Sequence, residues 1–100
     1  MYYIYILYSK SSDLHYIGYT NDYERRLWEH NNSPYNSFTS KHRPWILKAV
    51  FEVSNDIGIA MKAERFIKKQ KTKSFIEKIC AMEIVDLPMA QLVRVPQMRD

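Results

Sequence analysis

The stretch YIGYTNDYERRLWEH, residues 16–30, changes from a strand-like to a helix-like pattern within a few residues. With the preceding His15, its first residues read HYIGYT, and the tyrosine, isoleucine and threonine of this segment favour a strand over residues 15–20. Gly18 lies inside that strand. A glycine there marks either a bulge or a place where another backbone or a ligand approaches closely, or it is a tolerated residue of an edge strand.

The second half of the same stretch predicts a helix. Tyr23 and Leu27 are four residues apart, and Thr20 or Asn21 can cap the start. Two asparagines at positions 31 and 32 are expected to end this helix. Arg26 and His30 share one stripe of it, because residues four apart stack along a helix. A histidine at this position either forms a hydrogen bond at the helix end or takes part in chemistry.

The remaining elements follow from hydrophobic periodicity and turn residues. YYIYILY, residues 2–8, predicts a strand that pairs with residues 15–20 through a hairpin. We expect a third strand at residues 45–53, a long helix from Asp56 onward and a short helix at residues 73–84. The last stretch, residues 86–100, is interrupted by Pro88 and Pro96 and is expected to be irregular.

Composition bounds the class of protein. A chain of 100 residues is the size of one domain with a modest core, so we expect any active site to be an open surface cleft. The single Cys80 cannot form an internal disulfide, and the first residues lack the pattern of a secretory leader, which predicts a cytoplasmic protein. The longest apolar run, YYIYILY, is far too short to cross a bilayer, so we expect no membrane segment.

Basic residues are concentrated late in the chain. The net charge is +4, but residues 62–78 alone carry seven basic against two acidic residues. Such a strip is expected either for a polyanion partner or for a solvated helix face. Its members that we expect to contact nucleic acid are Lys62, Arg65, Lys68, Lys69 and Lys71.

A polar loop at residues 32–44 mixes aromatic and basic side chains. Tyr35 and Phe38 lie near Lys41 and Arg43, a combination suited to stacking on bases and pairing with phosphates. Anchoring of the loop to the core by these aromatic residues is the alternative.

One carboxylate is placed unusually on the long helix. Glu64 lies at the border of the apolar stripe formed by Ile59, Ala60, Ala63, Phe66 and Ile67, among outward-facing cations. The position predicts either a side chain at the rim of the sheet or an ion pair with Lys68.

Together these residues resemble a known family. YIY at residues 3–5, YIG at 16–18, Arg26 ten residues beyond Tyr16, His30 and Glu64 are similar to the motifs of the GIY-YIG endonucleases over about residues 2–80. The chain looks like the small stand-alone members, related to the incision domain of the excision-repair subunit UvrC.

The resemblance implies a fold and a site. The fold would be α/β of the α+β kind, a small three-stranded antiparallel sheet flanked by helices, in the order strand, strand, helix, strand, helix, helix. Residues 1–80 would form the nuclease domain and 81–100 the tail. The implied catalytic set is Tyr5 as general base, Tyr16 to position water or phosphate, Arg26 on the scissile phosphate, His30 assisting and Glu64 as ligand of Mg²⁺ or Mn²⁺.

The chain departs from the family pattern at three places. Tyr3 replaces glycine, Tyr19 follows the second tripeptide where repair enzymes tend to have lysine, and no asparagine occurs after Asn55. Lys41 or Arg43 would then supply the phosphate-contacting positive charge that this lysine provides in the repair enzymes. The predicted function is metal-dependent cleavage of DNA, branched or damaged DNA included, alone or with a specificity partner. The alternative is a weak or inactive module that binds nucleic acid or a protein.

Overall fold

The computed structural model describes residues 1–70 and 72–96. The elements in chain order are β1 (Tyr2–Ser9), β2 (Leu14–Thr20), α1 (Tyr23–Asn32), the 3-10 helix η1 (Thr39–His42), β3 (Trp45–Ser54), α2 (Ile57–Gln70), α3 (Lys73–Cys80), β4 (Ile84–Asp86) and β5 (Gln91–Arg94). Every predicted strand and helix is therefore present, although the short helix that was predicted to reach residue 84 ends at Cys80. None of the described helices is long and apolar enough to cross a membrane.

The sheet is antiparallel and has five strands in the order β2-β1-β3-β5-β4. The prediction of three strands is wrong, because β4 and β5 come from the segment that was expected to be irregular. Pro88 lies between these strands and Pro96 follows β5, so neither proline removes a hydrogen bond from within a strand. Val85 and Leu92 are buried, which attaches this segment to the core.

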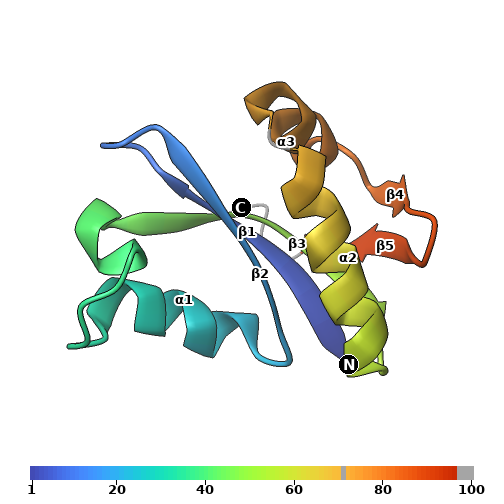
Figure 1. The fold of residues 1–100 in the computed structure, drawn as a ribbon, viewed down its shortest axis with the longest axis horizontal. Helices are drawn as coiled ribbons and strands as arrows, with labels where there is room; N and C mark the ends of the chain where they lie inside the picture. Colours follow the sequence, from blue (N-terminus) through green and yellow to red (C-terminus); the bar gives the residue numbers. More distant parts are fainter. Residues whose placement is uncertain (71, 97–100) are drawn as a thin grey trace.

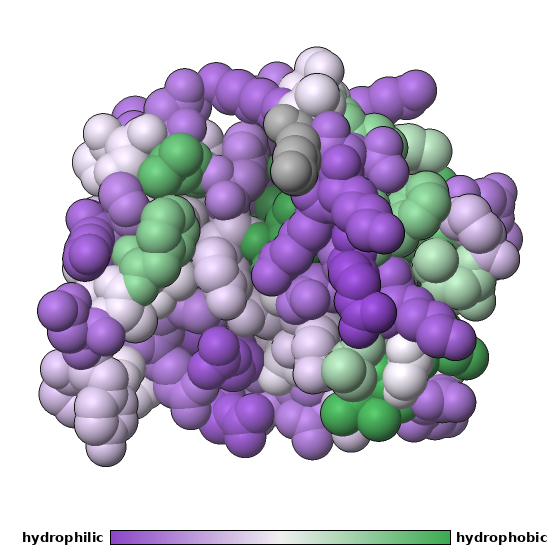
Figure 2. Space-filling view, in the orientation of Figure 1, coloured by the Kyte–Doolittle hydropathy of each residue, from purple (hydrophilic) through white to green (hydrophobic). Residues whose placement is uncertain are grey.

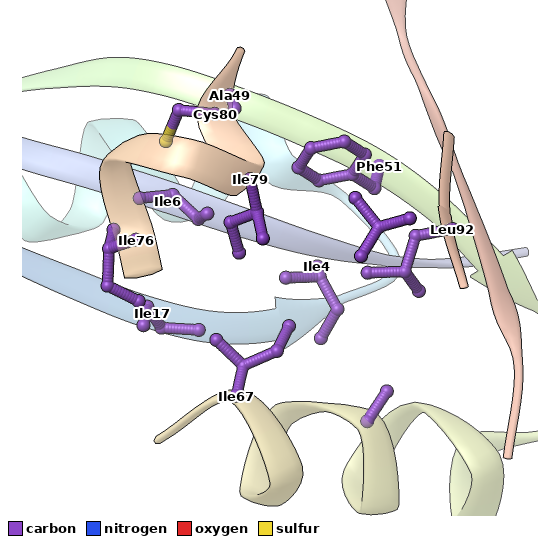
Figure 3. Packing of buried hydrophobic residues seen from close by; sticks show 12 residues of the cluster. Ile4, Ile6, Ile17, Ala49, Phe51, Ile67, Ile76, Ile79, Cys80 and Leu92 are labelled. Atoms are coloured by element: carbon purple, nitrogen blue, oxygen red, sulfur yellow. The ribbon is translucent and has the colours of Figure 1, made fainter. Parts of the chain in front are cut away.

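Helices cover both faces of the sheet (Figure 1). On one face, Ile4 and Ile6 pack with Phe51, Ile67 of α2 and Ile79 of α3 (Figure 3). The opposite face has a smaller cluster that includes Tyr23 and Leu27 of α1 and the sheet residues Tyr5, Leu7, Trp45 and Val50. Because side chains alternate along a strand, β1 supplies both cores.

The ends of α1 differ in one respect from the sequence expectation. Asp22, rather than Thr20 or Asn21, caps the helix, and its side chain accepts a hydrogen bond from the Arg25 amide at 3.1 Å. Thr20 instead accepts the Asp22 amide at 3.0 Å. The helix does end at Asn32, as predicted. The Asn31 side chain attaches this end of α1 to β3. Its Nδ2 donates to the Trp45 carbonyl at 2.9 Å, and its Oδ1 accepts from the Trp45 amide at 2.7 Å.

Candidate active site

Tyr5 lies in the middle of β1, directly opposite Gly18 in β2. Its ring crosses the glycine so closely that a Cβ atom at Gly18 would lie 2.4 Å from the phenolic oxygen. The two residues therefore fit only because Gly18 has no side chain. The sequence suggested close approach by another backbone or a ligand, whereas the group that approaches Gly18 is the side chain of Tyr5 on the neighbouring strand.

His30, at the end of α1, binds the Tyr5 hydroxyl. Its Nε2 lies 2.9 Å from Tyr5 Oη and 3.4 Å from a guanidinium nitrogen of Arg26. A guanidinium only donates, so Nε2 is assigned as the acceptor and Nδ1 as the N–H. That N–H then donates to Thr39 Oγ1 at 3.0 Å, and the Tyr5 hydroxyl donates to Nε2.

Burial keeps His30 neutral. Loss of solvent around the ring, assisted by the positive charges of Arg26 and Arg43, lowers the pKa of His30 to about 4. A neutral imidazole whose Nε2 is unprotonated is the form that accepts a proton, here from the Tyr5 hydroxyl that already donates to it. His30 is therefore both a helix-end hydrogen-bonding residue and a partner of Tyr5.

Tyr5 keeps its proton at rest. The side chain is 1% exposed, and burial raises its pKa to about 12, although the nearby Arg26 guanidinium opposes this effect. Electrostatic assistance from Arg26 is therefore too weak to give a free phenolate near neutral pH.

Arg26 is held by an acidic neighbour on the same helix. Its guanidinium donates to Glu29 Oε1 at 2.6 Å, and its side chain stays about one-third exposed. One guanidinium nitrogen is held by Glu29 and another lies near His30 Nε2, but the side chain is still partly exposed, so it can receive a phosphate without a large rearrangement.

Glu64 reaches the same place from the other side of the sheet. It lies on α2, with its side chain 20% exposed, and forms the predicted ion pair with Lys68 at 3.7 Å. A cleft of about 420 Å³ at the β2 edge has Tyr5, Tyr16, Arg26 and Glu64 in its wall, with Gly18 between them. Side chains from β1, β2, α1 and α2 thus meet in one cleft, which we name the catalytic cleft because the family resemblance predicts a catalytic role for these four residues.

A hard divalent cation fits this cleft better than a zinc ion does. Within residues 1–70 and 72–96, no group of three or more His, Cys, Asp and Glu side chains gathers around one point. Mg²⁺ usually keeps several waters and is bound by one or two carboxylates together with phosphate oxygens. Glu64 can supply the carboxylate, and the open cleft leaves room for water and phosphate.

The predicted nucleic-acid contacts fall into three groups. Exposed positions are occupied by Lys41, Lys62, Arg65, Lys68 and Lys69, and Figure 2 shows hydrophilic side chains over the region where Figure 1 places α2. Arg43 instead donates to the carbonyls of His30 and Ser33 at 2.6 and 2.8 Å, so it closes the end of α1. Lys71 lies outside the described residues.

Sequence reasoning missed Thr39, which completes the site behind His30. It is buried in η1, binds His30 Nδ1, and accepts the Trp45 indole N–H through its carbonyl at 2.8 Å. A lone threonine in a serine-rich loop has no periodicity or spacing that could have identified it.

Comparison with known proteins and protein families gave a family match. No curated protein matched the chain. Among protein families, the one described as GIY-YIG catalytic domain matches residues 1–78, which include both tyrosine tripeptides, α1 and α2. This match spans most of the chain, and the chain therefore belongs to the GIY-YIG family of nucleases.

Proposed function

We propose that this protein is a divalent-metal-dependent endonuclease that hydrolyses phosphodiester bonds in DNA, with branched or damaged DNA of repair or recombination as its substrate. The observation that carries the proposal is the catalytic cleft, where Tyr5, Tyr16, Arg26 and Glu64 meet from four elements. A module that only binds nucleic acid has no use for a carboxylate in such a cleft, because Glu64 repels phosphate.

Arg26 binds the scissile phosphate in this proposal. Its planar guanidinium matches two phosphate oxygens and stabilises the charge that develops on them during attack. The hydrogen bond to Glu29 fixes its direction, so little conformational entropy is lost when the phosphate binds. Tyr16, which borders the cleft beside Arg26, positions the attacking water or the phosphate.

Tyr5 and His30 form a path for the proton of the attacking water. Tyr5 with a pKa of about 12 cannot act as a free phenolate. It accepts the water proton as its own proton moves to His30 Nε2, 2.9 Å away. The water becomes hydroxide and forms a bond to phosphorus while the bond between phosphorus and the leaving sugar oxygen breaks, and one positive charge appears on the imidazole. The leaving oxygen takes a proton from solvent, and His30 later returns its proton to solvent.

Phosphate binding makes this transfer easier. In the free protein, the positive charge of Arg26 contributes to the low pKa of His30. A phosphate paired with Arg26 offsets that charge, which raises the pKa of His30 and makes its Nε2 a better proton acceptor. The path is therefore most effective when substrate is bound.

Glu64 would hold Mg²⁺ or Mn²⁺. When bound, such an ion supplies positive charge to the phosphate and to the leaving oxygen. GIY-YIG nucleases generally depend on a divalent metal, and the chain's own carboxylate and open cleft are consistent with this requirement. Competition from Lys68, the ion-pair partner of Glu64, predicts weak metal affinity in the absence of nucleic acid.

The test incubates the purified protein with branched, flapped, single-stranded and duplex DNA, and with RNA, in Mg²⁺ or Mn²⁺. We expect cleavage of DNA that stops on chelation. Glu64→Gln and Tyr5→Phe should each lower the rate by about a hundredfold or more, since each removes a group that acts on the reacting atoms.

Matched controls are present in the chain. Glu77→Gln changes an exposed carboxylate on α3, and Tyr8→Phe removes a hydroxyl that binds Asp13 at 2.8 Å. Both should leave cleavage unchanged. Cleavage that persists in the Glu64 and Tyr5 variants would overturn the mechanism, whereas binding without cleavage by the parent protein would identify a binding module.

A cytoplasmic location and a separate specificity partner complete the proposal. Cys80 is buried and free, which is consistent with a reducing compartment. The small size of the catalytic cleft leaves recognition of a long substrate to surfaces outside it, in this chain or in a partner.

A further inference from the structure

A second and larger cleft adjoins the catalytic cleft. Its volume is about 580 Å³, and its walls come from α1, from the loop that follows, and from η1. Tyr16 and Arg26 border both clefts, and His30 lines the second one. Whatever occupies this second cleft therefore lies next to the phosphate that Arg26 would bind.

Three exposed aromatic residues line the second cleft: Trp28, Tyr35 and Phe38, which are 63%, 79% and 53% exposed. For Tyr35 and Phe38, anchoring of the loop was the alternative to contact with nucleic acid, and this degree of exposure argues against anchoring. Phe38 does lie nearly parallel to Tyr16, with ring centroids 6.5 Å apart and planes at 27°. An aromatic surface thus continues from the catalytic cleft into the second one.

The charges around this aromatic surface favour a nucleobase over a phosphate. Glu29 lines the second cleft, and its carboxylate is already paired with Arg25 and Arg26. The carboxylate would repel a phosphate deep in this cleft, whereas it would not repel an uncharged base. A phosphate at Arg26 with its neighbouring base among the aromatic rings satisfies both observations.

We propose that the second cleft binds an unpaired nucleotide next to the scissile phosphate by stacking its base on Trp28, Tyr35 and Phe38. In a duplex the faces of the bases are covered by their neighbours, so only an unpaired strand can present one to the cleft. The inference rests on the proposed nuclease function and names its substrate class, which is DNA cut in or beside an unpaired segment.

The first test measures binding without cleavage. The Glu64→Gln protein is titrated, without metal, with a labelled oligothymidine strand and with a duplex of matched length, and anisotropy is recorded. We expect Trp28→Ala or Phe38→Ala in this background to weaken single-strand binding about tenfold and to leave duplex binding within about twofold. Ile57→Ala, which changes an exposed apolar residue at the start of α2, is the control and should change neither.

The second test reports stacking directly. The chain has two tryptophans, and Trp45 is buried, so quenching of tryptophan fluorescence by the oligothymidine strand should come from Trp28 and disappear in Trp28→Phe. If Trp28→Phe also retains most of the binding, an aromatic face rather than the indole itself is what the base requires.

The outcomes separate this inference from the nuclease proposal. Quenching and single-strand preference in a protein that cleaves nothing would support the second cleft and overturn the nuclease. Cleavage by the parent protein with equal single-strand and duplex binding in all variants would retain the nuclease and overturn the second cleft.

Discussion

Tyr5 is held on two sides, by the bare backbone of Gly18 and by His30 Nε2. The phenolic oxygen is therefore positioned by packing as well as by a hydrogen bond. This arrangement makes residues next to Tyr5 as important for its geometry as residues that would touch substrate. Two predictions follow from it at the scale of single residues.

Gly18→Ala should displace the Tyr5 ring. The added Cβ would lie 2.4 Å from Tyr5 Oη, in a strand where neither backbone nor ring can move freely. We expect a loss of about 1–3 kcal/mol in the free energy of unfolding from overpacking. Nuclease activity should fall about a hundredfold through misplacement of the hydroxyl.

Gly58→Ala is the control for this substitution. Its Cβ would lie 3.1 Å from the exposed Asp56 Oδ1, which can adjust. Urea unfolding and cleavage rates measured on both variants check the prediction, and parental activity in Gly18→Ala would contradict it.

His30 should make the protein less stable in mild acid. Its pKa is about 4 in the folded chain and near 6.5 when the chain is unfolded, so the unfolded state binds more protons between these values. The free energy of unfolding should therefore fall as the pH is lowered from about 6.5 to about 4. His30→Gln removes this contribution and should flatten the dependence.

The measurement is urea unfolding of both proteins across this pH range, comparing slopes rather than absolute stabilities. Burial also lowers the pKa of His15, so part of the slope should remain in the variant. An unchanged slope would show that His30 is not held neutral in the native state.

At the scale of elements, β4 and β5 complete the sheet beyond β3. β5 pairs with β3 at Phe51 and Glu52, and Leu92 joins the core between the sheet and α2 and α3. These strands are short, yet they cover the β3 edge and bury apolar area that the first 80 residues would otherwise expose. Residues 84–94 are therefore part of the folded unit.

Leu92→Ala tests the contribution of this segment. Leu92 is fully buried, so we expect a loss of about 2–5 kcal/mol in the free energy of unfolding from the cavity it leaves. Val93→Ala changes the next residue of β5, which is 42% exposed, and should cost less than about 0.5 kcal/mol. Equal and small effects in both variants would show that the segment does not pack as described.

At the scale of the whole molecule, the exposed cations of α2 should supply nonspecific affinity for DNA. Lys62, Arg65 and Lys69 are exposed and free to approach phosphates that flank the catalytic cleft, while Arg43 is committed to the end of α1. Each phosphate contact releases counterions, so affinity should fall with salt.

Replacing Lys62, Arg65 and Lys69 by glutamine should make the plot of log affinity against log salt less steep, reducing the magnitude of its negative slope by about three. Arg65→Gln alone should reduce it by about one. Binding measured with the Glu64→Gln protein over a salt series avoids cleavage. The loss should be equal for single-stranded and duplex DNA, because phosphates carry no sequence information. A slope that stays the same in the triple variant would place the DNA elsewhere.

Local pattern in the sequence correctly predicted α1, α2, α3 and the three strands before residue 80, because alternation and helical periodicity are properties of neighbouring residues. It missed the short 3-10 helix η1, which lies in the segment that was predicted as a loop. The resemblance to the GIY-YIG family, rather than local pattern, singled out Tyr5, Tyr16, Arg26, His30 and Glu64 as the candidate site. The strands after residue 80 were missed because β4 and β5 are short. Pro88 and Pro96 indicated an irregular segment, although both prolines lie outside the strands. Their pairing depends on β3, which is distant in sequence.

The sequence alone determined α1, α2, α3 and the three strands before residue 80, and it carries the motifs of the family, but it did not reveal η1, β4 or β5. Only the tertiary structure decided that Gly18 makes room for Tyr5, that His30 binds the Tyr5 hydroxyl, and that Arg43 closes α1. The physical reason is that these contacts join residues brought together by sheet order and by packing across its two faces. The spacing of residues along the chain shows neither the order of the strands in the sheet nor the packing across its faces.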